Sequence, residues 1–486
     1  MQENAANLLE TNFRKIINYL MVLLLGLFCT YLGFISLKNR WGASIYVLML
    51  IILYTKKKLV ALFISFHVVF LQNFVYNPVY QRANIFILKH ITLPESWISS
   101  KLFTTISQVN SLFLFFVVFF SILVKKNKIN KLSQKLLIVV VLSSLIMMSG
   151  SFLGLHAIND TVNAILSYNL LFIVIILIQI EFTREEVIRL FPYLLFCISI
   201  FQILLFIIFW IPSFIFNAAI LSGDWILGTA STNTNFLYLI GIAFIVYYFN
   251  MTNRLRNIVI FLFLLLLIFL PQAGTQTFLF FLSIVIVQVL FAFMNRTTLL
   301  RSFTLLLLSI VVTITMFFFI SHIFPYLGRH LNYAVDSIEM IHNEGLFNNP
   351  KILGIIRIIQ DYEKFGPASA LLGIGSGEFF KIQDSLFFLK VGDPLLTMRN
   401  AVYSPINILF YDFGILSGII YLFGYFTIYQ HIKSIYNKNK SNVIISCFTI
   451  LLYILFSHFF LPITSMIIVS IMAGAFIGSI IKISTN

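Results

Sequence analysis

Long apolar runs separated by short polar connections occupy most of the 486-residue chain. Apolar runs of roughly 18 to 25 residues recur along the whole length, and each is long enough for a helix to cross a bilayer core of about 30 Å. The pattern predicts an all-α, polytopic integral membrane protein with about fourteen membrane-spanning helices. The expected spans are 16–37, 41–55, 59–76, 102–124, 136–156, 162–181, 190–215, 235–250, 257–272, 277–294, 303–324, 403–430, 443–459 and 464–482.

The first two spans differ from the rest. The first, 16–37, is too long for the core of a signal peptide and lacks a small-residue cleavage site, so we expect it to remain in the protein. The second, 41–55, is short, and the lysines at 56–58 would have to snorkel towards the head groups at its end. Short connections join most spans, so we expect a single polytopic membrane domain over residues 1–486.

The one long polar interruption of this pattern lies at about 325–402. It contains eight of the seventeen acidic residues of the chain and the glycine-rich run GIGSGEFF at 373–380. Apolar residues within 331–341 repeat at helical spacing, and a second short helix is expected from about 351 to 364, before a Gly-Pro pair. We therefore expect a long loop that contains two amphipathic helices lying on the membrane surface.

Composition and charge narrow the class of protein. A chain with 60% hydrophobic and 10% charged residues and a mean hydropathy of +0.99 is not an ordinary soluble domain. The net charge of +15 would suit nucleic acid, but the Lys and Arg residues lie in short clusters between apolar runs, so nucleic acid is not expected as a partner. Twenty of the 32 Lys and Arg residues fall on one side of the predicted topology. Five fall on the other side when those of the long loop are left aside. The positive-inside rule then predicts that both termini are cytoplasmic and that the long loop lies outside.

The sequence gives no reason to expect a cofactor or a metal. The three cysteines, Cys29, Cys197 and Cys447, lie within apolar runs and have no partner at metal-ligand spacing. No pairing of His, Asp or Glu has such spacing either, and neither a Walker sequence nor a Ser-His-Asp order is present.

Three arginines of the long loop, Arg329, Arg357 and Arg399, are candidates for binding a lipid pyrophosphate. Arg357 belongs to a predicted helix whose apolar face would hold it near the lipid head groups, and a planar guanidinium binds phosphate through two parallel hydrogen bonds. The alternative for Arg357 is an ion pair with Asp361, four residues further along the same helix.

An acidic residue stands inside the twelfth predicted span, where Asp412 follows about nine residues after the span begins. An ionised aspartate at the centre of a membrane helix costs about 2.5 to 3.5 kcal/mol, so such a residue faces a polar cavity or a partner. A functional role and a hydrogen bond between helices both explain Asp412.

Further polar residues have two interpretations each. Asn233 and Asn235 belong to a hydrogen-bonding collar at the start of the eighth span, which can hold sugar hydroxyls or cap the helix. His330 and His342 of the long loop can act as bases on a hydroxyl or can be solvated surface residues. The run at 373–380 has no preceding strand, so a turn that directs the loop back to the membrane is favoured over nucleotide binding.

Three stretches resemble the family of bacterial O-antigen polymerases and O-antigen ligases, which are multispanning enzymes of extracytoplasmic glycan assembly. LGTASTNTNFLYLIG at 227–241 resembles the Gly-Thr…Asn segment that opens a span in the family, and PQAGTQTFLFFL at 271–282 resembles its Thr-Gly-Ser-Arg-like turn. Arg357, followed by LLGIGSGEFF and then by YSPINILFYDFGILSG, resembles the end of the family's long loop and the next span.

The chain departs from the family pattern at two places. Gln276 stands where the family turn usually has arginine. Tyr403 and Ser404 stand where the ligase branch usually has His-Asn, which favours the polymerase branch. Asp412 occupies a position at which the family commonly has an acid.

The resemblance implies a GT-C-like glycosyltransferase in the bacterial cytoplasmic (inner) membrane. Such an enzyme would transfer a growing O-antigen or capsule glycan from undecaprenyl pyrophosphate to a sugar hydroxyl of a new lipid-linked repeat unit. Asp412 and then His330 are the expected bases or orienting groups. The residues expected to contact substrate are Arg357, Arg399, Arg329, Asn233, Asn235, Gln276 and Tyr403.

The expected partners are the lipid-linked oligosaccharide, membrane lipids and a chain-length regulator protein. Two alternatives remain open at this point. One is a ligase that transfers finished glycan to lipid A core, and the other is a flippase for lipid-linked oligosaccharides.

Overall fold

The computed structural model of the chain is helical wherever it describes regular structure, and no strand occurs in those residues. The described residues form two compact units, and each unit is considered by itself. The described residues are 44–56, 58, 61–62, 65, 100–124, 129–153, 158–187, 283, 286–287, 311, 359–360, 362–364, 366–373, 405–439, 442–460 and 466–485.

The first unit is held together by a buried amide. It contains the helical residues 44–56 and the first part of α4 (Ser100–Val124). The side-chain oxygen of Asn110 accepts hydrogen bonds from the hydroxyl groups of Tyr46, at 3.2 Å, and Ser65, at 2.9 Å. All three residues are buried. Such bonds between apolar helices stabilise association in a membrane, where water does not compete for the polar groups.

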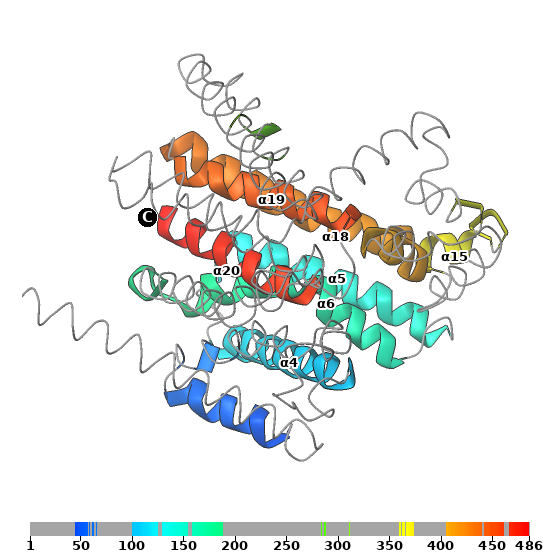
Figure 1. The fold of residues 1–486 in the computed structure, drawn as a ribbon, viewed down its shortest axis with the longest axis horizontal. Coiled ribbons are helices and arrows are strands. Elements are labelled where there is room, and N and C mark those ends of the chain that lie inside the picture. Colours follow the sequence, from blue (N-terminus) through cyan, green and yellow to red (C-terminus); the bar gives the residue numbers. More distant parts are fainter. Residues whose placement is uncertain are drawn as a thin grey trace, which may run out of the picture. The chain divides into compact units, whose positions relative to one another are not determined.

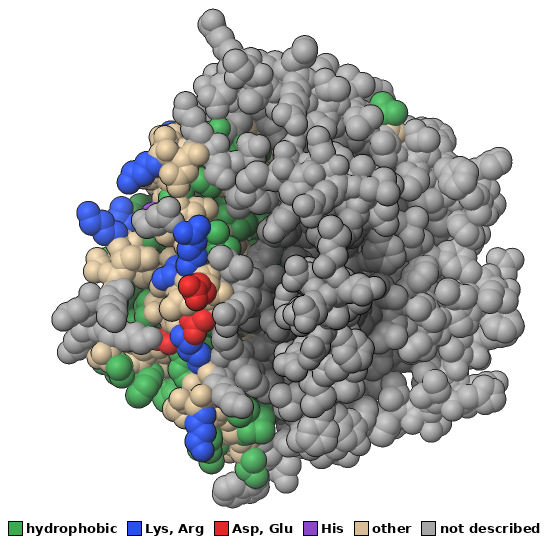
Figure 2. Space-filling model, turned by 90° about the vertical axis from the view of Figure 1, so that its left-hand side faces the viewer, with side chains coloured by type: hydrophobic (Ala, Val, Ile, Leu, Met, Phe, Trp, Pro, Cys, Tyr) green, Lys and Arg blue, Asp and Glu red, His purple; other side chains and the backbone are tan. Residues whose placement is uncertain are grey.

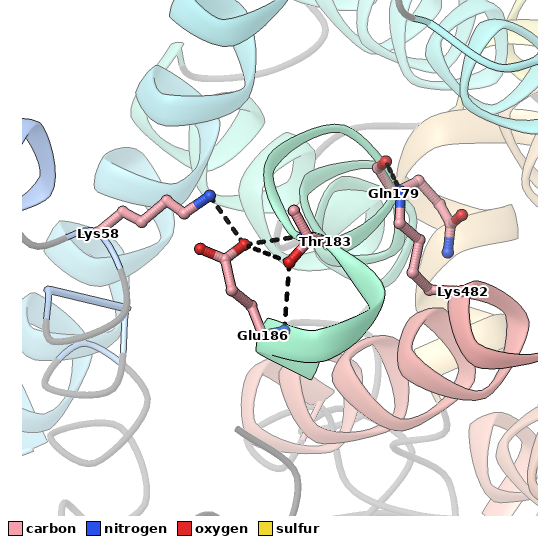
Figure 3. A network of polar contacts seen from close by, with 5 residues as sticks. All are labelled: Lys58, Gln179, Thr183, Glu186 and Lys482. Carbon is pink, nitrogen blue, oxygen red and sulfur yellow. Dashed lines mark hydrogen bonds and ion pairs between the residues drawn. The ribbon is translucent and has the colours of Figure 1, made fainter. Parts of the chain in front are cut away.

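An ion pair lies elsewhere in the first unit, where a helix begins after Thr183 (Figure 3). The Glu186 carboxylate accepts a hydrogen bond from the Thr183 backbone N–H at 2.9 Å and lies 3.0 Å from the Lys58 ammonium. The Thr183 hydroxyl in turn accepts from the Glu186 backbone N–H at 3.2 Å, so the pair forms a capping box. Burial opposes ionisation of Glu186, but the Thr183 amide and Lys58 outweigh it and lower the pKa of this carboxyl.

The second unit is a bundle built around α6 (Figure 1). Its helices are α5 (Lys131–Phe152), α6 (Ile158–Glu181), α15 (Pro367–Leu372), α18 (Pro405–Asn439), α19 (Asn442–Phe460) and α20 (Met466–Ser484). The helix α6 packs against α5, α18 and α20, and every residue from Tyr168 to Ile178 is buried. A helix that is apolar on all sides belongs in the centre of a bundle, and α6 occupies that place.

Two glycines of α20 allow it to approach α6 closely. Gly474 and Gly478 are four residues apart, and their Cα atoms face Val174 and Ile178 of α6 respectively. A Cβ atom on Gly474 would lie 2.8 Å from the Cβ of Val174 and 2.9 Å from the Leu171 carbonyl oxygen. Small residues at this spacing are typical of membrane helices that pack backbone against backbone.

We expect Gly474→Ala to destabilise the protein by about 1 to 3 kcal/mol, because α20 must move away from α6 to make room for the methyl group. Gly478→Ala is the matched control, since its Cβ would lie 3.1 Å from the Cβ of Ile178 and needs only a small adjustment. Thermal unfolding of the detergent-solubilised protein should give the larger decrease in Tm for Gly474→Ala. Equal decreases would show that the close contact with Leu171 and Val174 carries no special cost.

Polar side chains join four helix ends at one end of the second unit. The Asn130 side chain caps α5 by accepting from the Ser133 backbone N–H at 2.8 Å and donates to the Gln179 side chain near the end of α6 at 3.3 Å. Lys482 of α20 donates to the Gln179 carbonyl oxygen at 2.9 Å (Figure 3). The Asn439 side chain donates to the Ser484 carbonyl oxygen at 2.9 Å, which brings the end of α18 to the same place.

The described lysines of the membrane helices in this unit lie near these ends, in the first two turns of α5, the last two turns of α18 and the last turn of α20. They are Lys131, Lys135, Lys433, Lys438 and Lys482. Figure 2 shows basic and acidic side chains on the described part of the surface that it faces. At the opposite end of the bundle, Ser151 of α5 and Thr161 of α6 are hydrogen-bonded.

The helices agree with the expected spans wherever the chain is described. The expected spans 102–124, 136–156, 162–181, 403–430, 443–459 and 464–482 overlap α4, α5, α6, α18, α19 and α20, although α5 begins and ends earlier than expected and α18 ends later. By length and composition, three described helices can cross a membrane, namely Lys131–Phe152, Ala164–Glu181 and Ile408–Asn439. The described part of the chain is therefore all-helical, with helices that are long and apolar enough for a membrane protein. The number of fourteen spans remains a prediction, because most of the other runs lie outside the described residues.

Candidate functional site

The helix α18 is interrupted near its beginning. Gly414 has φ 79° and ψ 173°, a backbone conformation that only glycine adopts readily, while helix continues on both sides of it. An interruption leaves backbone N–H and carbonyl groups without partners in the helix, and in a membrane this is tolerated only where protein surrounds them. Asp412 and Phe413 before Gly414 and Ser417 after it are buried. Such an interruption marks a place where polar backbone is available inside an apolar bundle.

The end of α15 fills the interruption. Gly373 ends α15 with φ 96°, and its backbone N–H donates to the Ser369 carbonyl oxygen at 2.8 Å. A Cβ atom on Gly373 would lie 2.6 Å from the Phe413 nitrogen and would overlap the Asp412 carbonyl group. A Cβ atom on Gly414 would lie 2.5 Å from the Gly373 nitrogen. Two glycines from distant parts of the sequence thus permit direct contact between their backbones.

A tyrosine of the preceding segment makes a second contact with α18. The Tyr362 hydroxyl donates a hydrogen bond to the carbonyl oxygen of Phe410, which lies one turn before Gly414. The carbonyl groups at the end of a helix lack partners further along it, so the phenol supplies one. Burial and the nearby Asp412 carboxylate raise the pKa of Tyr362 well above its ordinary value, so this hydroxyl remains protonated and able to donate.

Asp412 lies at the centre of this arrangement, with only 3% of its surface exposed. Its charge acts on Tyr362 from the loop and on Tyr168 of α6. Asp412 lies in the second turn of α18, two residues before the interruption at Gly414. A buried carboxylate can accept a proton from, or orient, a hydroxyl that reaches it.

A second polar cluster lies further along α18, between α18 and α19. His458 Nε2 lies 2.6 Å from the Tyr421 hydroxyl and 3.4 Å from that of Tyr425, and the two hydroxyls are 3.2 Å apart. His458 Nδ1 lies 2.5 Å from the Ile454 carbonyl oxygen, which can only accept, so Nδ1 carries a proton. In the neutral ring Nε2 then accepts from Tyr421, whose oxygen can accept from Tyr425.

Sequence reasoning missed this cluster, although a signal for it existed. Tyr421 and Tyr425 are four residues apart and share one face of an expected span, and His458 stands at the end of the next. The ring of Tyr421 also packs edge-to-face against Tyr168, with centroids 5.7 Å apart, so the cluster reaches α6. We interpret the cluster as structural, because all three of its polar side chains are buried and joined to one another.

We expect Tyr421→Phe to destabilise the protein by about 1 to 2 kcal/mol, because His458 Nε2 would lose its nearest donor inside the bundle. Tyr425→Phe should cost less, since its hydroxyl makes the longer contact with His458. Chemical unfolding of the two variants in the same detergent provides the comparison. A larger loss for Tyr425→Phe would contradict the proposed direction of the hydrogen bonds.

Of the nine residues expected in the site, the structure describes Asp412. Arg329, Arg357, Arg399, His330, Asn233, Asn235, Gln276 and Tyr403 lie outside the described residues, as do His342 and Asp361. The expected end of the loop helix is confirmed, since helix extends to Lys364 and Gly366 has φ 89°. The short helix α15 that follows was not expected, although a proline in its first position is a typical helix start.

Comparison of the chain with models of known protein families finds no match, and comparison with curated proteins finds no match either. Within the described part of the chain, no three His, Cys, Asp or Glu side chains lie close enough together to hold a metal ion.

Proposed function

We propose that the chain is a membrane glycosyltransferase that polymerises lipid-linked repeat units of a surface polysaccharide, either O-antigen or capsule. The observation that carries the proposal is the buried Asp412 beside an interrupted helix, against which Tyr362 and the end of α15 dock. A polymerase of this kind needs a polar site at the membrane surface, next to a loop that binds the lipid carrier. The resemblance to O-antigen polymerases supplies the reaction.

The distribution of lysines supports an outward-facing site. The described lysines of the membrane helices in the second unit lie at the end where α18 and α20 terminate, whereas Tyr362 contacts the other end of α18. The positive-inside rule assigns the lysine-rich end to the cytoplasm. Asp412 then faces the outer leaflet of the bacterial cytoplasmic membrane, and both termini are cytoplasmic.

The proposed reaction is a displacement at the anomeric carbon of the growing glycan. The bond from this carbon to the undecaprenyl pyrophosphate oxygen breaks, and a bond to a hydroxyl oxygen of the new repeat unit forms. The proton of that hydroxyl passes to Asp412, with His330 as the alternative acceptor. Arg357, Arg399 and Arg329 neutralise the leaving pyrophosphate, while Asn233, Asn235, Gln276 and Tyr403 contact the sugars or the carrier.

A transporter is the second candidate function, because an interrupted helix inside a membrane bundle is also typical of secondary transporters. A flippase for lipid-linked oligosaccharides would move the repeat unit across the membrane without forming a bond. A ligase is less favoured, because Tyr403 and Ser404 replace the His-Asn pair of that branch.

The direct test is to supply the purified full-length protein, in membrane vesicles, with a lipid-linked repeat unit. A polymerase should give a ladder of products of increasing length, each one repeat longer than the last. A ligase gives a product only when lipid A core is added, and a flippase moves the unit to the other leaflet with its length unchanged. The absence of a ladder under conditions in which the substrate binds would contradict the polymerase proposal.

A further inference from the structure

We propose that Tyr362 is a positioning residue, which fixes the loop segment that carries Arg357 to the interrupted helix that carries Asp412. This inference rests on the proposed function, because it assigns the relative placement of two groups of the proposed reaction to one hydrogen bond. Two contacts of the loop with α18 lead to it, at Tyr362 and at Gly373.

The first contact, at Tyr362, holds the loop segment against α18. The Tyr362 hydroxyl reaches the Phe410 carbonyl oxygen, two residues before Asp412 in α18. The same hydroxyl lies within the electrostatic influence of the Asp412 carboxylate. Tyr362 therefore joins the loop to α18 at the position of the buried acid, and its partner is a backbone group that a substitution cannot remove.

The second contact, at Gly373, fixes one end of the segment, so the hydrogen bond of Tyr362 can determine how the rest of the segment lies. Eleven residues after Tyr362, Gly373 is held against the backbone of Asp412 and Phe413. The chain between the two contacts contains a turn at Gly366 and the helix α15, so it is compact. With Gly373 fixed, we expect the Tyr362 hydrogen bond to set the direction of the helical residues 359–360 that precede it.

The sequence carries this placement on to Arg357. The sequence predicts a helix from about 351 to 364, and in such a helix Arg357, five residues before Tyr362, would be about 7.5 Å from it along the helix axis. Loss of the Tyr362 bond would leave the arginine able to bind a pyrophosphate, but in variable positions relative to Asp412. Misplacement of reacting groups by about 1 Å can reduce the rate of a reaction a hundredfold without abolishing binding.

The test measures the distance between the loop and α18 together with the rate of polymerisation. Both are compared between Tyr362→Phe and Tyr429→Phe. Tyr429 is a matched control, because it is a partly exposed tyrosine of α18 whose ring stacks on Phe426 in the half of the helix beyond the interruption. Spin labels at the exposed positions Glu363 and Ile419, in full-length protein whose cysteines are replaced by alanine, report the separation of loop and helix. The assay of product ladders gives kcat. The number of sites that bind undecaprenyl pyrophosphate is measured in parallel, and kcat is expressed per such site.

For Tyr362→Phe we expect a broadened distance distribution and a decrease in kcat of about tenfold or more, with KM and the number of binding sites unchanged. Tyr429→Phe should keep a narrow distribution and full turnover. A narrow distribution or normal kcat in Tyr362→Phe would overturn the inference. Failure of Tyr362→Phe to fold, while Tyr429→Phe folds, would overturn it in favour of a purely structural role.

The two proposals fail in different ways. If the unsubstituted protein binds the substrate and yields no ladder, the proposed function is wrong, and the role of Tyr362 in transfer is wrong with it. The spin-label distances would still show whether Tyr362 holds the loop against α18. If the ladder forms and only the comparison of tyrosines fails, the proposed function stands without this positioning role.

Discussion

Alanine at Gly414 is expected to prevent the end of α15 from docking against α18 and to destabilise the protein by about 3 kcal/mol or more. Two effects add at this position. The backbone has φ 79° and ψ 173°, a region that costs a residue with a side chain about 1 to 3 kcal/mol. In addition, the new Cβ would lie 2.5 Å from the Gly373 nitrogen, and backbone atoms cannot move aside as a flexible side chain does.

The chain provides a control that separates the two effects. Gly366 has nearly the same backbone conformation, with φ 89° and ψ 177°, but a Cβ atom there would meet nothing within 4 Å. Gly366→Ala therefore tests the cost of the conformation alone, about 1 to 3 kcal/mol. Gly373→Ala should resemble Gly414→Ala, because its Cβ would meet the backbone of Asp412 and Phe413.

Thermal unfolding of the four proteins in one detergent, together with limited proteolysis of the loop, checks this prediction. Gly373→Ala and Gly414→Ala should unfold at lower temperatures than Gly366→Ala, and their loop should be cleaved faster. If all three variants lose the same stability, the loop does not depend on contact between the two backbones.

Much of the bundle could be predicted from the sequence, because the length of an apolar run directly reflects the thickness of the bilayer. The expected bounds are less accurate where a helix continues beyond the lipid. The helix α5 begins at Lys131, before the expected span, because Asn130 caps it among polar residues. The helix α18 continues to Asn439, beyond the expected end at 430, and Ile432, Ile435 and Tyr436 of this extension are buried.

The interruption of α18 could not be predicted in the same way. A single glycine in an apolar run is usually tolerated within a helix, so Gly414 alone gives no signal of a break. The break depends on Gly373 and Tyr362, which are distant from it in the sequence and come close only in the folded bundle. Asp412 was found because an acid in an apolar run has a high cost, whereas its neighbours Tyr168 and Tyr362 are of a residue type that is common in membrane helices.

Arg357→Ala is expected to abolish long glycan chains in cells while the protein remains inserted and folded. A preorganised cationic donor directed at a developing negative charge is worth about a hundred- to a thousandfold in rate, so its loss should leave mainly single repeats on the anchor. Arg357→Lys keeps the charge but loses the two-point contact, and we expect chains of intermediate length. A gel of surface glycan, with the amount of membrane-inserted protein measured in parallel, gives the result.

Two further variants separate a role in binding from an ion pair within the helix. Lys364→Ala removes a positive charge from the same segment and should leave chain length unchanged. Asp361→Asn should also leave it unchanged if Arg357 binds the pyrophosphate, whereas equal and mild effects of Asp361→Asn and Arg357→Ala would indicate an Arg357–Asp361 pair. Chain length in Arg357→Ala equal to that of the unsubstituted protein would exclude this arginine from the site.

The side of the membrane on which this segment lies decides between the proposed reaction and any cytoplasmic one. Lys364 is exposed and close to the contact of Tyr362 with α18, so a cysteine introduced there reports the side directly. We expect Lys364→Cys to react with a membrane-impermeant maleimide added to intact spheroplasts, and Lys438→Cys, at the other end of α18, to react only after lysis. The opposite pattern would place Asp412 beside the inner leaflet, where an acceptor that has already crossed the membrane does not meet it, and the polymerase proposal would then fail.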